Sequence, residues 1–158
     1  MQKSLIPKKN VLLQNNSDND LDVTSSKLSI LVVDDDALNL IASSMTVRSF
    51  GYAVDEASSG QIALDKIKVR TYAAILMDVQ MPNMDGLECS VEIRAMEQGS
   101  DHRIPIIAFS SQLESDIKQD CFDAGMDAIL EKGCSSAQLA TVLKRFILDE
   151  PDSPRVAS

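Results

Sequence analysis

Acidic residues follow directly after two apolar runs of this sequence. The letters LVVDDD place Asp34, Asp35 and Asp36 after one run, and ILMD places Asp78 at the end of another. A carboxylate is costly to remove from water, and two unit charges about 4 Å apart repel by roughly 4 kcal/mol at an effective dielectric constant near 20. If the two runs end side by side, their carboxylates need a cation. Hard oxygen ligands favour Mg²⁺, with Mn²⁺ as the alternative, whereas Asp36 is expected to cap a helix.

A hydroxyl group and an ammonium group follow two further apolar runs. The letters IIAFSS carry Ser110 and Ser111, and AILEK carries Lys132. Together with the acids, these groups fit phosphoryl transfer to a carboxylate, in which Asp78 attacks in line. The lysine and the metal would neutralise the phosphoryl oxygens, and the hydroxyl would donate a hydrogen bond to one of them. Asp78 is therefore the candidate nucleophile, and Ser110 and Lys132 are its candidate catalytic partners.

These groups meet at one edge only if strands and helices alternate regularly. Short runs rich in β-branched or apolar residues predict five strands. The strands are expected at Leu28–Val33, Tyr52–Asp55, Ala73–Met77, Ile104–Phe109 and Ala128–Leu130. A stretch long enough for a helix follows each one, which predicts an α/β fold: a five-stranded parallel sheet of order 2-1-3-4-5 in a flavodoxin-like (βα)5 three-layer sandwich. In that order strands one and three are neighbours, so Asp78 should lie beside the end of strand one.

The length and composition favour one compact domain. The chain has 158 residues, of which 44% are hydrophobic, enough for a substantial core. Residues 1–27 are polar and lack a sustained period, so they are expected to form a flexible arm or linker. Residues 149–158 contain two prolines and are expected to form a disordered tail. The folded domain is therefore predicted to span residues 28–148.

Charge, hydropathy and cysteine content narrow the classes of partner and compartment. The formal net charge is −9 and no basic stripe is visible, which argues against nucleic-acid binding. No apolar run approaches the roughly 18 residues of a membrane span, so no membrane insertion is expected. The three cysteines, Cys89, Cys121 and Cys134, form no CxxC pair and are expected to be reduced thiols. The sequence therefore predicts a cytoplasmic protein. It gives no prediction of the oligomeric state.

Four motifs in this order resemble the receiver domains of two-component response regulators, over about residues 28–147. They are LVVDDD, LMDVQMPNMDGLE, IPIIAFSS and AGMDAILEKG. The amino-acid sequences of the second and third motifs are most similar to those in receivers of hybrid histidine kinases or multistep phosphorelays. The sequence does not decide between a stand-alone receiver and a fragment of a longer protein.

The resemblance implies a role for each matching residue. Asp34 and Asp35 would be the acidic pair that binds the metal, and Asp78 would be both the phosphorylation site and a metal ligand. The backbone carbonyl of Gln80 would be a further ligand, Ser110 the family's hydroxyl residue and Lys132 its lysine. The phosphoryl donor would be phosphohistidine on a histidine kinase or a histidine phosphotransfer protein. Such a domain phosphorylates and dephosphorylates itself rather than turning over a substrate.

The chain departs from the family pattern at two positions. Gly133 stands where the family usually has a proline after the lysine, often preceded by a cis peptide. Ile129 stands where the family commonly has an aromatic switch residue, so a smaller conformational change is expected.

The first helix is expected to present the residues beside Asn39 to the phosphodonor. Leu38, Ile41 and Met45 are predicted to lie on or near the apolar stripe of this helix.

Two alternative functions remain open at this point. Asp34 and Asp36 also satisfy the Asp-x-Asp pattern of magnesium-dependent phosphohydrolases of the haloacid dehalogenase type, with Asp34 as nucleophile and Asp36 as acid and base. That interpretation leaves Asp78 and Lys132 less well explained. A pseudo-receiver that binds partners without being phosphorylated is the other alternative, and Gly133 is its best support.

Overall fold

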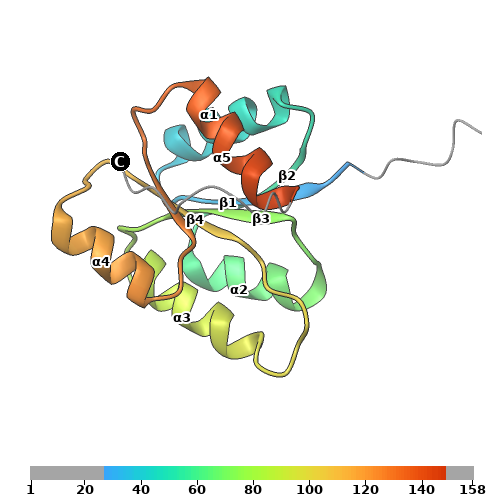
Figure 1. Ribbon diagram of the computed structural model, residues 1–158, viewed down its shortest axis with the longest axis vertical. Helices are drawn as coiled ribbons and strands as arrows, with labels where there is room; N and C mark the ends of the chain where they lie inside the picture. Colours follow the sequence, from blue (N-terminus) through green and yellow to red (C-terminus); the bar gives the residue numbers. More distant parts are fainter. Residues whose placement is uncertain (1–26, 149–158) are drawn as a thin grey trace, which may run out of the picture.

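The computed structural model describes residues 27–148, in which five strands alternate with five helices (Figure 1). The strands are β1 (Ser29–Val33), β2 (Ala53–Ala57), β3 (Ala74–Asp78), β4 (Ile106–Ser110) and β5 (Ala128–Glu131). The helices are α1 (Ala37–Ser49), α2 (Gly60–Val69), α3 (Gly86–Met96), α4 (Ser115–Asp123) and α5 (Ser136–Ile147). The predicted tail and, apart from Lys27, the predicted arm lie outside the described residues.

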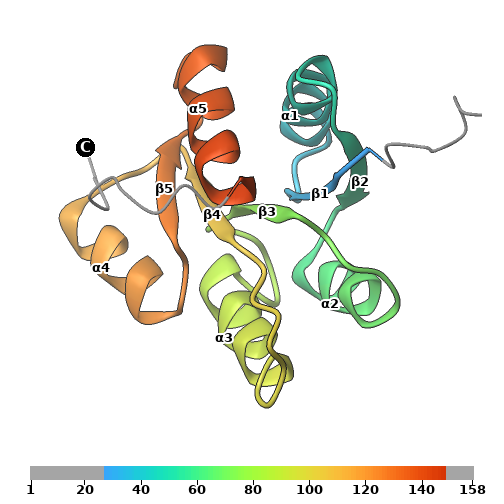
Figure 2. The ribbon, with the colours of Figure 1, turned by 45° about the vertical axis from the view of Figure 1, so that its right-hand side comes forward.

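The five strands form one parallel sheet in the order β2-β1-β3-β4-β5, which confirms the predicted fold class. Helices α1 and α5 cover one face, and α2, α3 and α4 cover the other (Figure 2). Side chains of β1 alternate between the two layers: Leu31 and Val33 join the core beneath α2 and α3, while Ile30 and Val32 join the core beneath α1 and α5. Among the described residues, no helix combines the length and apolar character that a membrane span requires.

Local hydrogen bonds explain where several helices begin and end. The side chain of Asp36 accepts a hydrogen bond from the Asn39 N–H at 2.9 Å, which confirms Asp36 as the N-cap of α1. Ser135 caps α5 in the same way. After α1, Gly51 has a φ of 95°, the left-handed conformation that glycine adopts at little cost.

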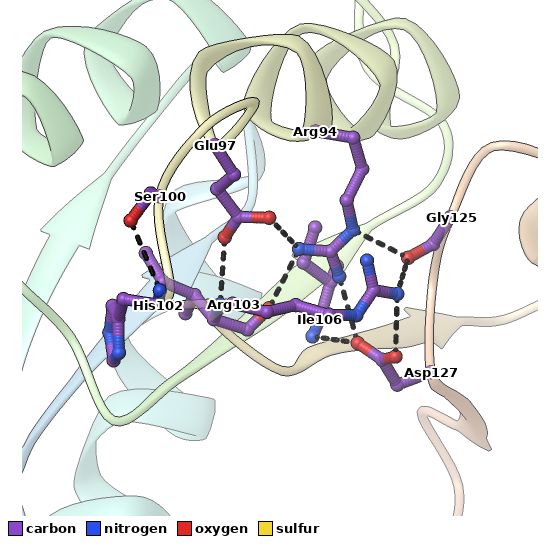
Figure 3. A network of polar contacts seen from close by, with 9 residues as sticks. Arg94, Glu97, Ser100, His102, Arg103, Ile106, Gly125 and Asp127 are labelled. Carbon is purple, nitrogen blue, oxygen red and sulfur yellow. Dashed lines mark hydrogen bonds and ion pairs between the residues drawn. The ribbon is translucent and has the colours of Figure 1, made fainter.

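Strand β4 begins two residues later than the sequence predicts, next to a polar network around Arg94 and Asp127 (Figure 3). The backbone of Ile104 is held by this network instead of pairing in the sheet. Its N–H donates to Glu97 at 2.7 Å, and its carbonyl accepts from Arg94 at 2.9 Å. Arg94 also pairs with Asp127 at 2.8 Å, and the same carboxylate accepts the Ile106 N–H at 2.9 Å. The network joins the end of α3 to the starts of β4 and β5, at the end of the sheet remote from Asp78.

Helix α1 buries a different face from the one predicted. Leu38, Ile41 and Met45 are predicted to lie on or near the apolar stripe of this helix, but they are 78%, 52% and 64% exposed, so they are not on the face that packs against the sheet. The buried face instead contains two serines and two aliphatic residues. These are Leu40, Ser43, Ser44 and Val47. The small serines let the helix lie close to the sheet, and the large apolar residues point to solvent.

Candidate active site

The ends of β1 and β3 bring three carboxylates together. Val33 pairs with Met77 in the parallel register, so the residues that follow them, Asp34 and Asp78, are neighbours at the carboxyl edge of the sheet. One carboxylate oxygen each from Asp34, Asp35 and Asp78 lies within 4.8 Å of the others. The predicted convergence of the two acidic motifs is thus present in the structure. Asp36 turns away to cap α1.

The three carboxylates differ in their exposure to solvent. Asp34 and Asp78 are only 2% and 5% exposed, while Asp35 is exposed. This donor set fits Mg²⁺, because hard oxygen ligands are close together on a rim where the ion could keep several of its waters.

Lys132, which follows β5, reaches across to both buried acids. Its Nζ lies 2.7 Å from Asp34 Oδ2 and 3.3 Å from Asp78 Oδ1. Burial lowers the pKa of Lys132, but its hydrogen bond to the Asp34 carboxylate and the charges of both acids outweigh that effect, so the pKa is raised overall. The lysine is therefore a cation that stays close to the candidate nucleophile.

Asp78 has a strongly perturbed pKa. Burial and the nearby charge of Asp34 raise it to about 6, although Lys132 and the N–H of Gln80 act in the opposite direction. That N–H donates to Asp78 Oδ1 at 3.3 Å. A carboxylate with a raised pKa beside a specific charge partner is typical of a functional site.

The hydroxyl of Ser110 is buried at the end of β4 but is engaged by a neighbouring loop. Its Oγ donates to the carbonyl oxygen of Gln112 at 2.9 Å and lies 3.2 Å from the Gln112 N–H. The side chain of Gln80 donates to that of Gln112 at 3.2 Å, which links the loops after β3 and β4. Sequence analysis did not identify Gln112, because its contacts with Ser110 are made by backbone atoms and leave no motif in the sequence.

Gly133 follows Lys132 where the family usually has proline, and the peptide bond between them is trans, unlike the cis bond that often precedes that proline. Among residues 27–148 every peptide bond is trans, including Lys132–Gly133.

Comparison with known proteins identifies the family. The model of the response regulator receiver domain matches residues 30–144. The chain belongs to the response regulator receiver domain family. This receiver domain is 37% identical over 121 residues to hybrid signal transduction histidine kinase L of Dictyostelium discoideum. That match covers 74% of the chain and only 7% of the kinase, so the chain spans a small part of this relative's length.

Solved structures agree with the family assignment. The receiver domain of sensor histidine kinase PA1611 from Pseudomonas aeruginosa PAO1, which has a magnesium ion in its active-site cleft, superimposes with a TM-score of 0.71. It is 35% identical, and the match covers 77% of this chain and 98% of that one. The receiver domain of the histidine kinase CKI1 from Arabidopsis thaliana, complexed with Mg²⁺ and BeF₃⁻, is 33% identical with a TM-score of 0.67, covering 75% and 89% of the chains.

The comparisons bear on function as well as on fold. A receiver domain is a phosphoacceptor of two-component signalling, and magnesium in related domains agrees with the carboxylate cluster found here. They favour neither the dehalogenase-type phosphohydrolase nor the pseudo-receiver.

Proposed function

We propose that Asp78 accepts a phosphoryl group from phosphohistidine on a histidine kinase or a histidine phosphotransfer protein. The observation that carries this assignment is the contact of Lys132 with both buried acids, at 2.7 Å from Asp34 and 3.3 Å from Asp78. The Lys132 ammonium group thus lies beside Asp78, the last residue of the central strand β3.

The transfer is a displacement at phosphorus. An Asp78 oxygen forms the new O–P bond while the N–P bond of phosphohistidine breaks, and the imidazole leaves with the electron pair and takes up a proton. Lys132 pairs with a phosphoryl oxygen, and Ser110 donates its hydroxyl hydrogen to another after leaving Gln112. In autodephosphorylation, water attacks the phosphorus and the Asp78 carboxylate is released.

The metal ligands are assigned to the acidic edge. Asp34, Asp35, Asp78 and the backbone carbonyl of Gln80 would hold Mg²⁺, or Mn²⁺ in its place. When bound, the ion supplies positive charge that offsets the charge of the phosphoryl oxygens. Asp34 and Asp35 would serve only to hold the ion, whereas Asp78 would both bind it and accept the phosphoryl group.

The partner surface is assigned to α1. Leu38, Ile41 and Met45 recur at helical spacing and are exposed on α1, the helix that also carries Asn39 and begins directly after the three aspartates. An exposed apolar stripe of this kind suits the helical bundle of a histidine phosphotransfer protein.

The free cysteines Cys89, Cys121 and Cys134 support a cytoplasmic location, where thiols are kept reduced.

Incubation with acetyl phosphate and magnesium, followed by intact-mass measurement and peptide mapping, tests the assignment. One phosphoryl group is expected on Asp78, with none on the Asp78→Asn variant. A phosphoryl group on Asp34 with sustained turnover of acetyl phosphate would instead establish the hydrolase alternative. The unmodified wild type with bound magnesium would support the pseudo-receiver.

A further inference from the structure

The first turn of α3 lies directly against the backbone of the strand end that carries Asp78. A Cβ atom placed on Gly86 would overlap the carbonyl oxygen of Asp78 and would lie 2.9 Å from the Cα of Val79. Both are backbone atoms, which cannot rotate aside as a flexible side chain does. Residue 86 therefore has to be glycine for the helix to approach the strand so closely.

Hydrogen bonds hold Gly86 in this position from both sides. Its N–H donates to the carbonyl of Val79 at 2.9 Å, which closes the loop of residues 79–86. Its own carbonyl accepts from the buried Ser90 hydroxyl at 2.7 Å. The N-cap residue Asp85 forms a capping box with Glu88, which stabilises the same turn.

The loop closed by Gly86 contains Gln80, which faces the candidate nucleophile. The N–H of Gln80 donates to Asp78 Oδ1 at 3.3 Å, so the position of this loop and that of the Asp78 carboxylate are coupled. A displacement of the Asp78–Val79 peptide would move both.

We propose that Gly86 is a positioning residue for the magnesium site. Its missing side chain lets α3 close on β3, and this contact sets the Asp78 carboxylate and the Gln80 carbonyl toward one ion. The inference rests on the proposed function, because it takes both groups as ligands.

The test is the magnesium affinity of the Gly86→Ala variant, measured by calorimetric titration of the full chain. The added methyl group has to displace the strand end or the helix, so the affinity should fall on the order of 10-fold, the size of loss seen when groups that orient metal ligands are changed. Circular dichroism without magnesium checks that the variant is folded.

Two matched variants separate positioning from general loss of stability. Gly133→Ala makes the same chemical change where nothing lies within 4 Å, and it should keep both stability and affinity. Gly125→Ala is destabilising because its φ is 92° and its Cβ would lie 2.8 Å from Arg94 Cγ. This position is at the remote end of the sheet, so the variant should lose stability and keep its affinity for magnesium.

A folded Gly86→Ala variant with wild-type magnesium affinity overturns the inference. If that variant does not fold, Ser90→Ala decides: removing its hydrogen bond to the Gly86 carbonyl should weaken magnesium binding about threefold, in the lower range of one hydrogen bond. Unchanged affinity in Ser90→Ala would then reject the positioning role. Wild-type affinity in Asp35→Asn is a separate result, because it rejects the proposed metal site itself.

Discussion

Lys132 Nζ lies between Asp34 and Asp78, 2.7 Å from Asp34 Oδ2 and 3.3 Å from Asp78 Oδ1. One ammonium group thus offsets two buried carboxylates that come from different strands. Because it already contacts Asp78, it needs only a small shift to pair with a phosphoryl group there. The remaining negative charge of the cluster favours a metal ion.

Magnesium should stabilise the protein, and Asp35→Asn should remove most of that gain. A ligand that binds only the folded state at 100 times its dissociation constant adds about 2.7 kcal/mol to the free energy of unfolding. Melting curves with and without magnesium measure this effect. Asp36→Asn is the control, because asparagine also caps a helix and the neighbouring carboxylates remain. An unchanged melting shift in Asp35→Asn would count against the site.

The raised pKa of Asp78 gives this residue a contribution to the stability of the metal-free protein that becomes less favourable as the pH rises. Its pKa is about 6 in the folded state, above the ordinary value of 3.8, mainly because of burial and then Asp34. Between these values the folded state binds the extra proton, so stability falls with increasing pH and the full penalty is present above pH 6. Asp78→Asn removes this penalty.

The variant should therefore be more stable than the wild type at pH 7 by on the order of 2–3 kcal/mol, and the difference should shrink toward pH 4. Denaturant unfolding without magnesium, at several pH values, measures it. A difference that grew as the pH fell would show that Asp78 is stabilised as a carboxylate instead.

The acidic site was predictable because it depends on strand ends and strand order. Apolar runs in the sequence locate β1 and β3, and the strand order 2-1-3-4-5 makes Asp34 and Asp78 neighbours. Edge strand β2 was harder, because the charged residues Asp55 and Glu56 interrupt the apolar signal. The start of β4 was also hard to predict, because it depends on a hydrogen bond to Arg94, a residue of helix α3.

Tertiary packing determined what the sequence could not predict. Leu38 and Ile41 look like core residues by hydropathy, but the face of α1 that meets the sheet carries small serines. The close approach of Gly86 to Asp78 depends on how the loop after β3 closes. Glycine in a sequence permits such a contact without specifying its partner.

The exposed stripe of α1 should control transfer from the phosphodonor. Leu38→Ala combined with Ile41→Ala should slow transfer from a cognate phosphotransfer protein about tenfold, equivalent to about 1.4 kcal/mol of binding or transition-state energy. Phosphorylation by acetyl phosphate should not change, since that small donor needs no docking surface. Val69→Ala, at an 85% exposed residue on α2, is the control. Equal transfer rates in all variants would place the interface elsewhere.

Phosphorylation should shift the conformation of the face formed by α4, β5 and α5 only in part. Ser110 has to give up its hydrogen bond to Gln112 in order to donate to the phosphoryl group. A shift of a two-state equilibrium from 1:99 to 99:1 takes about 5.5 kcal/mol. Hydrogen bonds from Ser110 and Lys132 to the phosphoryl group, at roughly 1.5 to 3 kcal/mol each, leave little surplus.

The switch position holds Ile129, a half-buried residue that lines a cavity of about 490 Å³ between α4 and α5. NMR spectra with and without beryllofluoride and magnesium should show averaged, intermediate shifts near Ile129. Ile129→Phe should enlarge the change, because the cavity that residue 129 lines has room for an aromatic ring. Changes confined to the acidic edge in both proteins would exclude the switch, and the domain would then act as a phosphoryl carrier without conformational output.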